Sequence, residues 1–432
     1  MTYQLICGAE IHVELKTKSK MFCGCKNDPF HAPKPNCYTC PVCLGLPGAL
    51  PVPNKKAVED TILLGLALHS TISEVSKFDR KHYFYPDLPK GYQISQYDQP
   101  LCLGGYVDTS FGRVNITRIH LEEDTAKLQH AEVDGKKVSL IDFNRSSVPL
   151  MEIVTEPDIH SAEQAKEFLK KIRDIVRALG ISDADMEKGS MRLEANISLS
   201  PDGKLPNYKV EVKNINSFRF YGLAIDSEIK RQTEVLDKGE TPIQETRGFR
   251  QDGATTVSQR TKEEAADYRY FPEPDIPTLI ISREMVESIR TRLTTLPDEA
   301  VDELMKQGIS ASTAKILIQN PEMVTFIEQV KKINEKHVVS AANAIVNKKI
   351  DLKQVTPEEY CKSVDKQGER KIADVSILEA AIQKNPKAVQ DYLTGNSGAT
   401  GVIMGKVMRD GGGKIDAQAT ASLLKELLDK LK

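Results

Sequence analysis

The chain has 432 residues, 40% of them hydrophobic and 28% charged. A chain of this length is too long for one ordinary hydrophobic core, so about two to four domains are expected. With 59 basic and 61 acidic side chains, the formal net charge of −2 indicates no particular partner, although it leaves room for a local basic face. No apolar run approaches the roughly 20 residues of a membrane helix, and the N-terminus begins with a strand-like segment, so we expect a cytoplasmic protein with neither a membrane span nor a signal peptide.

The first predicted element is a strand over residues 3–15, in which polar and apolar residues alternate. Glu10, His12 and Glu14 fall on one face of this strand, and apolar residues fall on the other. Two acids that flank a histidine suit a divalent cation. An edge strand with a solvated outer face would show the same alternation, so this segment alone leaves both interpretations open.

Cysteines gather immediately after this strand. They form two tight pairs, Cys23-x-Cys25 and Cys40-x-x-Cys43. Two thiolate pairs on separate turns can close a tetrahedral zinc shell, so we predict a structural zinc bound by these four residues in a loop over about residues 20–48. Cys37 and His31 lie in the same segment, so spacing does not fix the ligand set, and unliganded thiols are the alternative. Five of the eight cysteines lie here, which indicates metal ligands in a reducing compartment and not disulfides.

Two amphipathic helices are predicted next along the chain, with a segment rich in cations and tyrosines between them. The first covers residues 54–69 and is capped by Asn54, and the second covers residues 161–179, where Ser161 and Gln164 form a capping box. The segment between them, residues 77–93, suits phosphate binding or stacking on a base. A proline-bent surface loop is the alternative.

Three later segments carry further acids. His120–Asp124 follows a predicted strand over residues 114–119, and a cluster of this kind is by itself more often a charged turn than a metal site. Glu152 has apolar neighbours on both sides, so its carboxylate must be paired, protonated or bound to a metal. Arg192, Glu194 and Asn196 alternate with apolar residues and so share one face.

Four strands that offer acids to one surface indicate a pocket for hard cations, which usually work together with nucleotide phosphates. This pattern favours phosphoryl transfer. The sequence has no Walker loop, no kinase glycine-rich loop and no Rossmann fingerprint, so an ATP site would have to be built on the sheet.

The sequence becomes mainly helical from Pro297 onward. Helices are predicted over residues 310–319 and 321–334, the polar segment 351–374 is interpreted as a linker, and a last helical unit is predicted over residues 376–432. The turn Gly411-Gly412-Gly413-Lys414 in that unit is not a phosphate loop, because position 408 is methionine and isoleucine follows the lysine.

These motifs resemble a known family, the B subunit of the tRNA-dependent amidotransferase GatCAB. The resemblance covers nearly the whole chain and is most specific over residues 1–280. The matching stretches are Gly8–Leu15, Cys40–Gly48, Lys81 with Tyr83–Gln96, His120–Asp124, Val148–Asp158, Lys213–Arg219 and Asp267–Asp275.

The resemblance implies an α+β fold in three parts. A cradle domain over residues 1–293, similar to the glutamine synthetase and guanido kinase folds, would carry the zinc loop. An all-α helical domain and linker over residues 294–375 and a YqeY-like helical tail domain over residues 376–432 would follow. The helical region between about residues 300 and 375 is shorter than is typical of the family.

The resemblance also implies a reaction. ATP, with Mg²⁺, would phosphorylate the side-chain carboxylate of Glu-tRNA(Gln), Asp-tRNA(Asn) or both, and ammonia would then displace the phosphate. The ammonia would come from a partner glutaminase, the A subunit, within a heterotrimer that also contains the small C subunit. A non-catalytic, zinc-stabilised tRNA-binding scaffold and a free-standing carboxylate–amine ligase are the alternatives.

Site residues are carried over position by position. The catalytic residues are expected to be Glu10, His12, Glu122, Glu123 and Glu152. Mg²⁺ would be bound by Glu10, His12, Glu123 and Glu152. Nucleotide or substrate would contact Lys81, Tyr83, Lys90, Arg192 and Glu194. Phosphates of tRNA would contact Lys387, Lys406, Arg409 and Lys414 in the tail. Three residues beside the presumed pocket depart from the commoner family residue, namely His82, Ser147 and Glu194.

Overall fold

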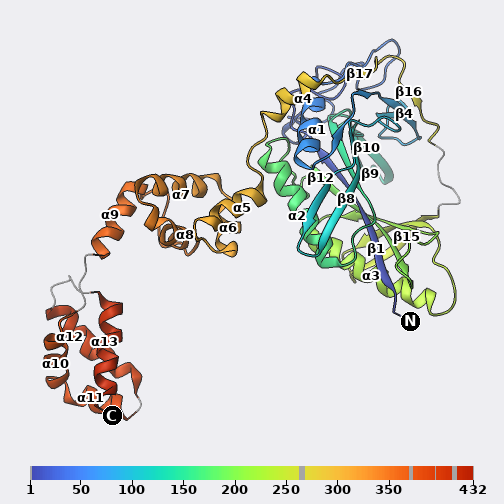
Figure 1. Ribbon diagram of the computed structural model, residues 1–432. Helices are drawn as coiled ribbons and strands as arrows, with labels where there is room; N and C mark the ends of the chain where they lie inside the picture. The colour runs from blue at the N-terminus through green and yellow to red at the C-terminus, as the bar shows by residue number, and fades with distance from the viewer. Residues whose placement is uncertain (1, 262–267, 369–372, 395, 411–415, 432) are drawn as a thin grey trace. The chain divides into compact units, whose positions relative to one another are not determined.

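The computed structural model describes residues 2–261, 268–368, 373–394, 396–410 and 416–431 (Figure 1). It contains two compact units, Met1–Pro297 and Asp298–Lys432. The first unit is a mixed α and β structure with one large sheet, and the second is helical. None of the described helices combines the length and the apolar character needed to cross a membrane.

The strands of the described residues all belong to the first unit. Their bounds are β1 (Gln4–Glu14), β2 (Thr71–Ile72), β3 (Val75–Ser76), β4 (Asp79–His82), β5 (Tyr92–Ser95), β6 (Cys102–Leu103), β7 (Tyr106–Thr109), β8 (Gly112–Glu123), β9 (Lys127–Val133), β10 (Lys136–Asp142), β11 (Pro149–Thr155), β12 (Met191–Ser200), β13 (Val210–Ile215), β14 (Glu245–Arg250), β15 (Thr255–Thr261), β16 (Phe271–Pro272) and β17 (Leu279–Ile280).

The helices are distributed over both units. The first unit has α1 (Lys55–Ala67), α2 (Ala162–Ala178), α3 (Phe218–Leu236), α4 (Arg283–Arg290) and the short 3₁₀ helix η1 (Pro29–His31). From the boundary onward the chain forms α5 (Pro297–Lys306), α6 (Ala311–Leu317), α7 (Pro321–Ile333), η3 (Glu335–His337), α8 (Val338–Val346), α9 (Pro357–Gly368), α10 (Val375–Gln383), α11 (Pro386–Leu393), η4 (Ser397–Ala399), α12 (Thr400–Asp410) and α13 (Ala417–Asp429).

A 10-stranded sheet organises the first unit in the order β15-β14-β13-β12-β1-β11-β8-β6-β2, with β7 paired to β8. All of its pairings are antiparallel except β13 with β14. The predicted strand over residues 3–15 is confirmed as β1, and it lies in the centre of the sheet between β12 and β11. The alternative interpretation of this segment as an edge strand is therefore wrong.

Period-two alternation divides the central strands into an apolar and a polar face. On β1 and β12 the apolar side chains, among them Ile11, Val13 and Ile197, are fully buried in the main hydrophobic cluster. Helices α2 and α3 run along the same side of the sheet (Figure 1) and contribute Phe168, Ile172 and other side chains to that cluster. The polar face is left to line the candidate site.

Both helices predicted in the first unit are confirmed. The Asn54 side chain accepts hydrogen bonds from the first turn of α1, and the Ser161 side chain accepts one from the Gln164 backbone at the start of α2. The Gln164 side chain in turn accepts from the backbone N–H of His160, one residue before the expected partner. Such bonds satisfy backbone donors that have no partner inside the helix.

Two expectations about residues 77–124 are corrected. The strand that was expected to end at residue 119 continues as β8 to Glu123, so its acids belong to a buried strand and not to a charged turn. Residues 77–93 contain β4 and the start of β5, which pair with each other, and β16 adds to the edge of β4, so the segment is not simply a surface loop (Figure 1).

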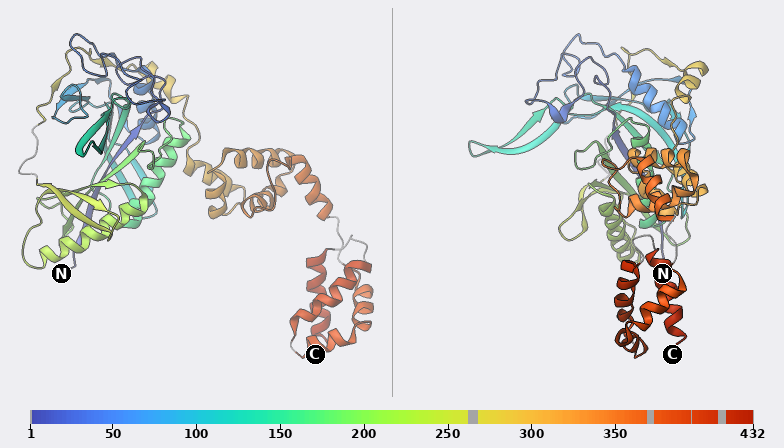
Figure 2. Two further views of the ribbon diagram at one scale, coloured as in Figure 1. Left: turned by 180° about the vertical axis from the view of Figure 1, so that it is seen from behind. Right: turned by 90° about the vertical axis from the view of Figure 1, so that its left-hand side faces the viewer.

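The paired strands β9 and β10 form a separate two-stranded ribbon. Figure 2 shows this ribbon standing away from the rest of the first unit. Its outer side chains, including Val133 and Leu140, are exposed.

The described residues of the second unit form two hydrophobic clusters. One is built from α5 to α9, with Leu317, Ile327 and Val330 at its centre, and the other from α10 to α13, with Leu378 and Leu424 fully buried. The expected helices over residues 310–319 and 321–334 are confirmed as α6 and α7.

The interpretation of residues 351–374 as a linker is wrong for Pro357–Gly368, which forms α9. This segment is mostly polar, but Tyr360 and Cys361 are buried in the first of the two clusters, and the Tyr360 ring packs edge-on against Phe326. A helix with few apolar residues can still pack into a core when those residues lie on one face against neighbouring helices. The glycine-rich turn at residues 411–414 lies outside the described residues.

Candidate active site

Four neighbouring strands place a row of polar side chains on the same face of the sheet. His12 on β1 lies opposite Arg192 on β12 and opposite Glu152 on β11, and Glu152 in turn lies opposite His120 on β8. Directly opposed residues of antiparallel strands share a face and have close Cβ atoms. The row therefore reads Arg192, His12, Glu152 and His120 across the sheet.

Glu152 lies between two histidines. Its Oε2 is 3.5 Å from His12 Nε2 and 3.2 Å from His120 Nε2. A second carboxylate, Glu122, approaches the same two rings at 3.9 Å and 3.7 Å and accepts a hydrogen bond of 3.0 Å from the Ser95 hydroxyl. Glu122 and Glu152 are both almost fully buried. Buried carboxylates at such distances need positive charge, which the histidines or a metal ion can provide.

A second pair of acids lies on the same face, two residues along β1 from His12. Glu10 is opposite Glu194 on β12, and its Oε1 is 3.8 Å from His12 Nε2. Lys213 on β13 donates a hydrogen bond of 2.7 Å to Glu194 and lies 3.5 Å from Glu211. The ammonium of Lys213 thus balances part of this negative charge.

These contacts shift the protonation of the cluster. Burial, together with the charges of Glu152 and Glu194, raises the pKa of Glu10 to about 7. Burial disfavours the charged form of His12, but the hydrogen bond and the charge of Glu152 outweigh it and raise the His12 pKa to about 9. The pKa of His120 also rises to about 9, because Glu152 and Glu122 outweigh the effect of burial. The two histidines in turn hold the pKa of Glu152 well below its usual value, despite burial.

Two overlapping groups in the cluster could hold a metal ion. One consists of Glu10, His12 and Glu194, and the other of His12, Glu122 and Glu152; within each group the ligand atoms lie within 4.8 Å of one another. Carboxylate oxygens with one imidazole suit Mg²⁺ or Mn²⁺. The donor set therefore fits a hard divalent cation, with His12 common to both groups.

Glu123 is not part of either group. Neighbouring residues of a strand point to opposite sides, and the Glu123 carboxylate accepts from Lys90 Nζ at 2.7 Å and from the backbone N–H of Ile94 at 3.0 Å. Glu123, Lys90 and Ser147 line a cavity of about 220 Å³ beside the cysteine loop. The structure thus separates Glu123 and Lys90 from the cluster around His12.

Arg192 takes part in a second buried network. Its guanidinium donates to the carboxylate of Asp124, which Arg145 also approaches at 3.8 Å. These two cations outweigh burial and lower the pKa of Asp124 to about 2, whereas burial and the charge of Asp124 raise the pKa of the neighbouring Glu14. The network anchors Arg192 at the end of the polar row.

Buried polar atoms without a hydrogen-bond partner concentrate on this part of the molecule. Seven such side-chain atoms occur in the described residues, and five of them belong to residues of the polar strands or the adjoining cavity: Glu14 Oε1, Glu123 Oε2, Ser147 Oγ, Arg192 Nε and Asn196 Oδ1. Native proteins pair most buried polar atoms, so these atoms mark positions where a water, an ion or a ligand can supply the partner.

Lys81 and Tyr83 lie at the edge of the cluster on and beside β4. The ammonium of Lys81 is 5.1 Å from the centre of the Tyr268 ring. Within the described residues, no carboxylate oxygen lies within 4.0 Å of Lys81 Nζ, the limit for an ion pair. The charges of Glu122 and Glu152 nevertheless outweigh burial and raise the pKa of Lys81. Tyr83 donates a hydrogen bond of 3.4 Å to Gln93. Lys81 therefore interacts with the charges of the acids but forms no direct ion pair with them in the described residues.

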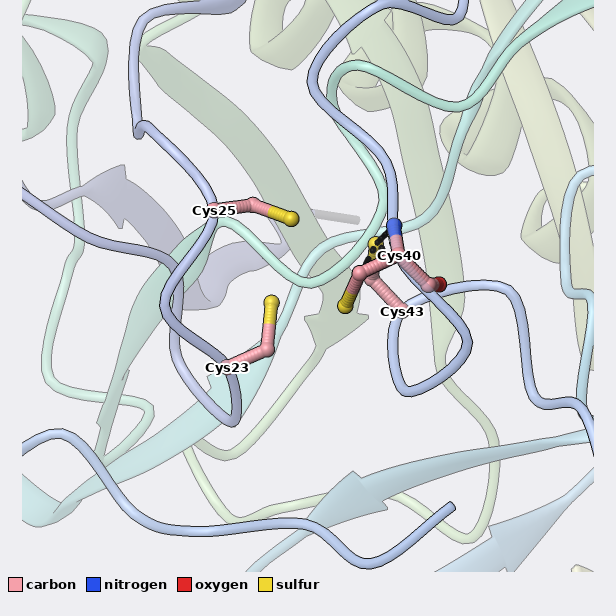
Figure 3. A group of neighbouring side chains, drawn as sticks. All are labelled: Cys23, Cys25, Cys40 and Cys43. Atoms are coloured by element: carbon pink, nitrogen blue, oxygen red, sulfur yellow. Dashed lines mark hydrogen bonds between the residues drawn. The ribbon is translucent and has the colours of Figure 1, made fainter. Parts of the chain in front are cut away.

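The four cysteines predicted as metal ligands form one group, in which all sulfur atoms lie within 4.8 Å of one another (Figure 3). Cys40 and Cys43 Sγ are 3.9 Å apart, close to the spacing of two ligands on one zinc. Cys37 lies outside the group and its thiol contacts the Lys34 carbonyl at 3.1 Å. His31 is also outside it and contacts Asp28. Four thiols at this spacing fit a closed metal shell.

Buried positive charge supports the cysteine group. Lys20 is fully buried, and its Nζ lies 3.8 Å from Cys43 Sγ and 3.1 Å from the Phe143 carbonyl. A hydrogen bond from Cys23 and the charge of Lys20 outweigh burial and lower the pKa of Cys43 to about 5. The site therefore favours at least one thiolate, which is the form that binds metals.

The tail residues predicted to contact tRNA occupy two helices. Lys387 lies in α11, and Lys406 and Arg409 lie in α12, while Lys414 lies outside the described residues.

Comparison with known proteins identifies the family. Residues 5–287 match the model of the GatB/GatE catalytic domain, and residues 284–428 match that of the GatB domain. The chain is 43% identical to the B subunit of the aspartyl/glutamyl-tRNA(Asn/Gln) amidotransferase of Dehalococcoides mccartyi, with 99% of each chain covered. It is 42% identical to that of Caldanaerobacter subterraneus subsp. tengcongensis, with 100% of each covered, and 41% identical to that of Thermotoga maritima, with 99% of this chain and 100% of the relative covered. This chain belongs to the GatB family.

The alignments with these GatB relatives are longer than this chain. The alignment with the Dehalococcoides protein spans 490 positions, of which this chain of 432 residues can occupy at most 432, so at least 58 positions are gaps.

Several residues of the candidate site were given no role in the prediction from the sequence. His120 and Ser95 contact the acids directly, and Lys213 and Asp124 neutralise its two ends. The alternation along residues 114–123, if continued through the acids, would have indicated that His120 and Glu122 share a face. Ser95 on β5 and Lys213 on β13 lie in stretches that resemble the family, but alternation and spacing do not indicate that they contact the acids.

Divalent-cation affinity of the GatB cluster is expected to rise with pH between about 7 and 9. The metal-free pKa values of Glu10 and His12 are about 7 and 9, and a metal must displace protons from both groups below these values. Binding of Mn²⁺, measured calorimetrically in two buffers of different ionisation enthalpy, should therefore release protons at pH 7. A Glu10→Gln variant should lose the part of the pH dependence near 7. An affinity that does not change with pH would contradict these protonation states.

Proposed function

We propose that this chain is the component that activates and amidates the side-chain carboxylate of Glu-tRNA(Gln), Asp-tRNA(Asn) or both. The observation that carries the proposal is the cluster of half-buried Glu10 and His12 with buried Glu122 and Glu152, which combines carboxylates and imidazole in the donor set of a hard cation. Burying so many ionisable groups costs stability unless a bound ligand compensates for it. This cost argues against a non-catalytic scaffold.

A carboxylate must be activated before ammonia can replace its oxygen. The γ-phosphoryl group of ATP would be transferred to the side-chain carboxylate, with release of ADP, to form an acyl phosphate. Ammonia would then attack the acyl carbon, and inorganic phosphate would leave with the carbon–oxygen bond electrons. Mg²⁺ bound by His12 with Glu122 and Glu152, or by His12 with Glu10 and Glu194, would neutralise charge on the phosphoryl group.

Residues around the cluster would bind and orient these reactants. Lys81 has no acidic partner within ion-pair distance in the described structure, so its ammonium is free to contact a phosphate oxygen or the substrate carboxylate. Arg192 keeps an unpaired, buried Nε beside the row, which could donate to an anion. Glu123 and Lys90 would act from the adjoining cavity and not as ligands of the Mg²⁺ ion.

Further parts of the proposal concern the rest of the chain. The cysteine group would hold a structural Zn²⁺. The first unit would be a cradle similar to the glutamine synthetase and guanido kinase folds. The division into residues 1–293, 294–375 and 376–432 would separate catalysis from tRNA binding. Lys387, Lys406, Arg409 and Lys414 would contact tRNA phosphates. The protein would work in the cytoplasm with two partner chains, the glutaminase (A) and the small C chain of the heterotrimer.

The test is amide formation by the reconstituted complex. The chain is purified with its partner chains and supplied with Mg²⁺, glutamine and either Glu-tRNA(Gln) or Asp-tRNA(Asn), with and without ATP. We expect Gln-tRNA or Asn-tRNA only when ATP is present, with matching release of ADP and phosphate. Amide formation without ATP would overturn the activation step. Amidation of free glutamate at the same rate would instead indicate a ligase that does not need tRNA.

A further inference from the structure

Two tyrosines form a stacked pair beside the acidic cluster. The rings of Tyr97 and Tyr270 have centroids 4.2 Å apart and planes inclined by only 8°. Tyr97 is nevertheless 57% exposed, and its hydroxyl has no hydrogen-bond partner in the described parts of the chain. One face of the Tyr97 ring is thus covered by Tyr270, and the rest of the ring is open to solvent.

The loop that carries Tyr97 is held firmly. Asp79 accepts a hydrogen bond of 3.1 Å from the Tyr97 backbone N–H, and Lys77 bridges Asp79 and Asp98 at 2.7 Å each. The preceding Gln96 is buried and accepts from the backbone of Leu121 on β8 at 3.0 Å. An exposed ring on an anchored loop loses little conformational freedom when a ligand stacks on it.

The pair is connected to the site through other rings. The ring centroids of Tyr270 and Tyr268 are 6.0 Å apart, and those of Tyr268 and Tyr83 are 6.2 Å apart. The Lys81 ammonium lies over the Tyr268 ring. Burial raises the pKa of Tyr270 to about 12, and Lys81, Glu122 and Glu152 are among the charges that act on it. The aromatic surface therefore begins at the phosphate-binding side of the cluster and leads outward to Tyr97.

We infer that Tyr97, supported by Tyr270, is a stacking platform for the adenine base of a nucleotide whose phosphate or acyl end reaches the acidic cluster. The inference rests on the proposed function, which brings two adenosine groups to this site, that of ATP and the 3′-terminal adenosine of the aminoacyl-tRNA. Stacking on tyrosine suits any base and requires no hydrogen-bond code, and Lys81 lies between the platform and the acids to take a phosphate or carboxylate.

The test uses the complex of the full chain with its partner chains and the variants Tyr97→Ala and Tyr97→Phe. Phe111→Ala is the matched control, because Phe111 is 55% exposed and lies at the turn before β8, the end of that strand remote from the acids. The probes are labelled ATP with Mg²⁺, intact acceptor tRNA, and the same tRNA without its terminal adenosine. Equilibrium dissociation constants are measured for each, together with KM and kcat.

Loss of one stacked base corresponds to a weakening of about tenfold or more. We expect Tyr97→Ala to weaken binding of one adenosine-bearing ligand by about this factor with little change in kcat, while Tyr97→Phe and Phe111→Ala stay near wild type. A change confined to ATP assigns the base to the nucleotide. A change confined to intact tRNA, with loss of discrimination against the truncated tRNA, assigns it to the acceptor end.

Other results would overturn the inference. These are unchanged affinities for ATP and tRNA in Tyr97→Ala, equal losses in Tyr97→Phe and Tyr97→Ala, or failure of Tyr97→Ala to assemble with its partners, which would make Tyr97 an interface residue. The binding measurements do not require turnover. If Tyr97→Ala weakens binding of one adenosine-bearing ligand but the wild-type complex forms no amide, the proposed function fails and the platform stands.

Discussion

Replacing Glu152 by glutamine is expected to lower the rate of ATP-dependent amide formation about a thousandfold. The substitution keeps the size of the side chain but removes the charge that both His12 and His120 contact, at 3.5 Å and 3.2 Å. It also replaces one of the two carboxylate ligands in the group of His12, Glu122 and Glu152 by a neutral amide, which binds a divalent cation more weakly. Initial rates should be measured at saturating ATP, Mg²⁺ and charged tRNA, and Mn²⁺ binding should be measured in parallel.

Glu156→Gln provides the matched control for this change. Glu156 directly follows β11 and is exposed, so the same chemical change there leaves the cluster intact. Its activity should remain near that of wild type. In Glu152→Gln the histidine pKa values should also fall, because the charge that raises them is gone, and this shift is measurable by NMR titration. Retention of more than about a tenth of the activity would contradict the assignment of Glu152 to catalysis or metal binding.

Replacing Cys40 by serine is expected to abolish the bound zinc and to lower the melting temperature of the protein. Structural zinc sites contribute about 10–16 kcal/mol of apparent binding free energy, much of which is folding free energy of the surrounding loop. The loop also contributes Met21 and Phe22 to the main hydrophobic cluster, so its unfolding would expose part of that cluster. Metal content by mass spectrometry and thermal unfolding measure the two effects.

Cys37→Ser is the control for Cys40→Ser, because the two cysteines are three residues apart and only Cys40 belongs to the group. The Cys37→Ser protein should keep one zinc per chain and the wild-type melting temperature. Loss of zinc from Cys37→Ser but not from Cys40→Ser would show that Cys37, and not Cys40, is the ligand. A wild-type protein that binds no zinc would refute the structural metal altogether.

Local patterns carried much of the fold. The 2-residue alternation in β1 and β12 and the capping residues of α1 and α2 depend only on neighbours in the chain, so both helices and both polar strand faces could be predicted. The prediction failed at α9, where the few apolar residues become informative only through their contact with Phe326. It also ended β8 too early, because a run of acids resembles a turn when its partner strands are unknown.

The candidate site shows the same division. Its carboxylates, its histidine and the two cysteine pairs were visible in the sequence because those residue types in those spacings have few other uses. Alternation also implies that Glu122 and Glu123 point apart, but it does not say which of the two faces His12. Only the pairing of β8 with β11 and of β11 with β1 decides that Glu122 joins the cluster while Glu123 pairs with Lys90.

The sequence by itself determined the family, the strand and helix character of most segments, and the residue types available for metal and phosphate chemistry. The tertiary structure decided which of them meet: Glu152 between two histidines, Lys213 against Glu194, and Tyr97 stacked on Tyr270 from a segment more than 170 residues away. The physical reason is that strand register and long-range packing arise from the whole core, whereas alternation, capping and ligand spacing are set by bonds within a few residues.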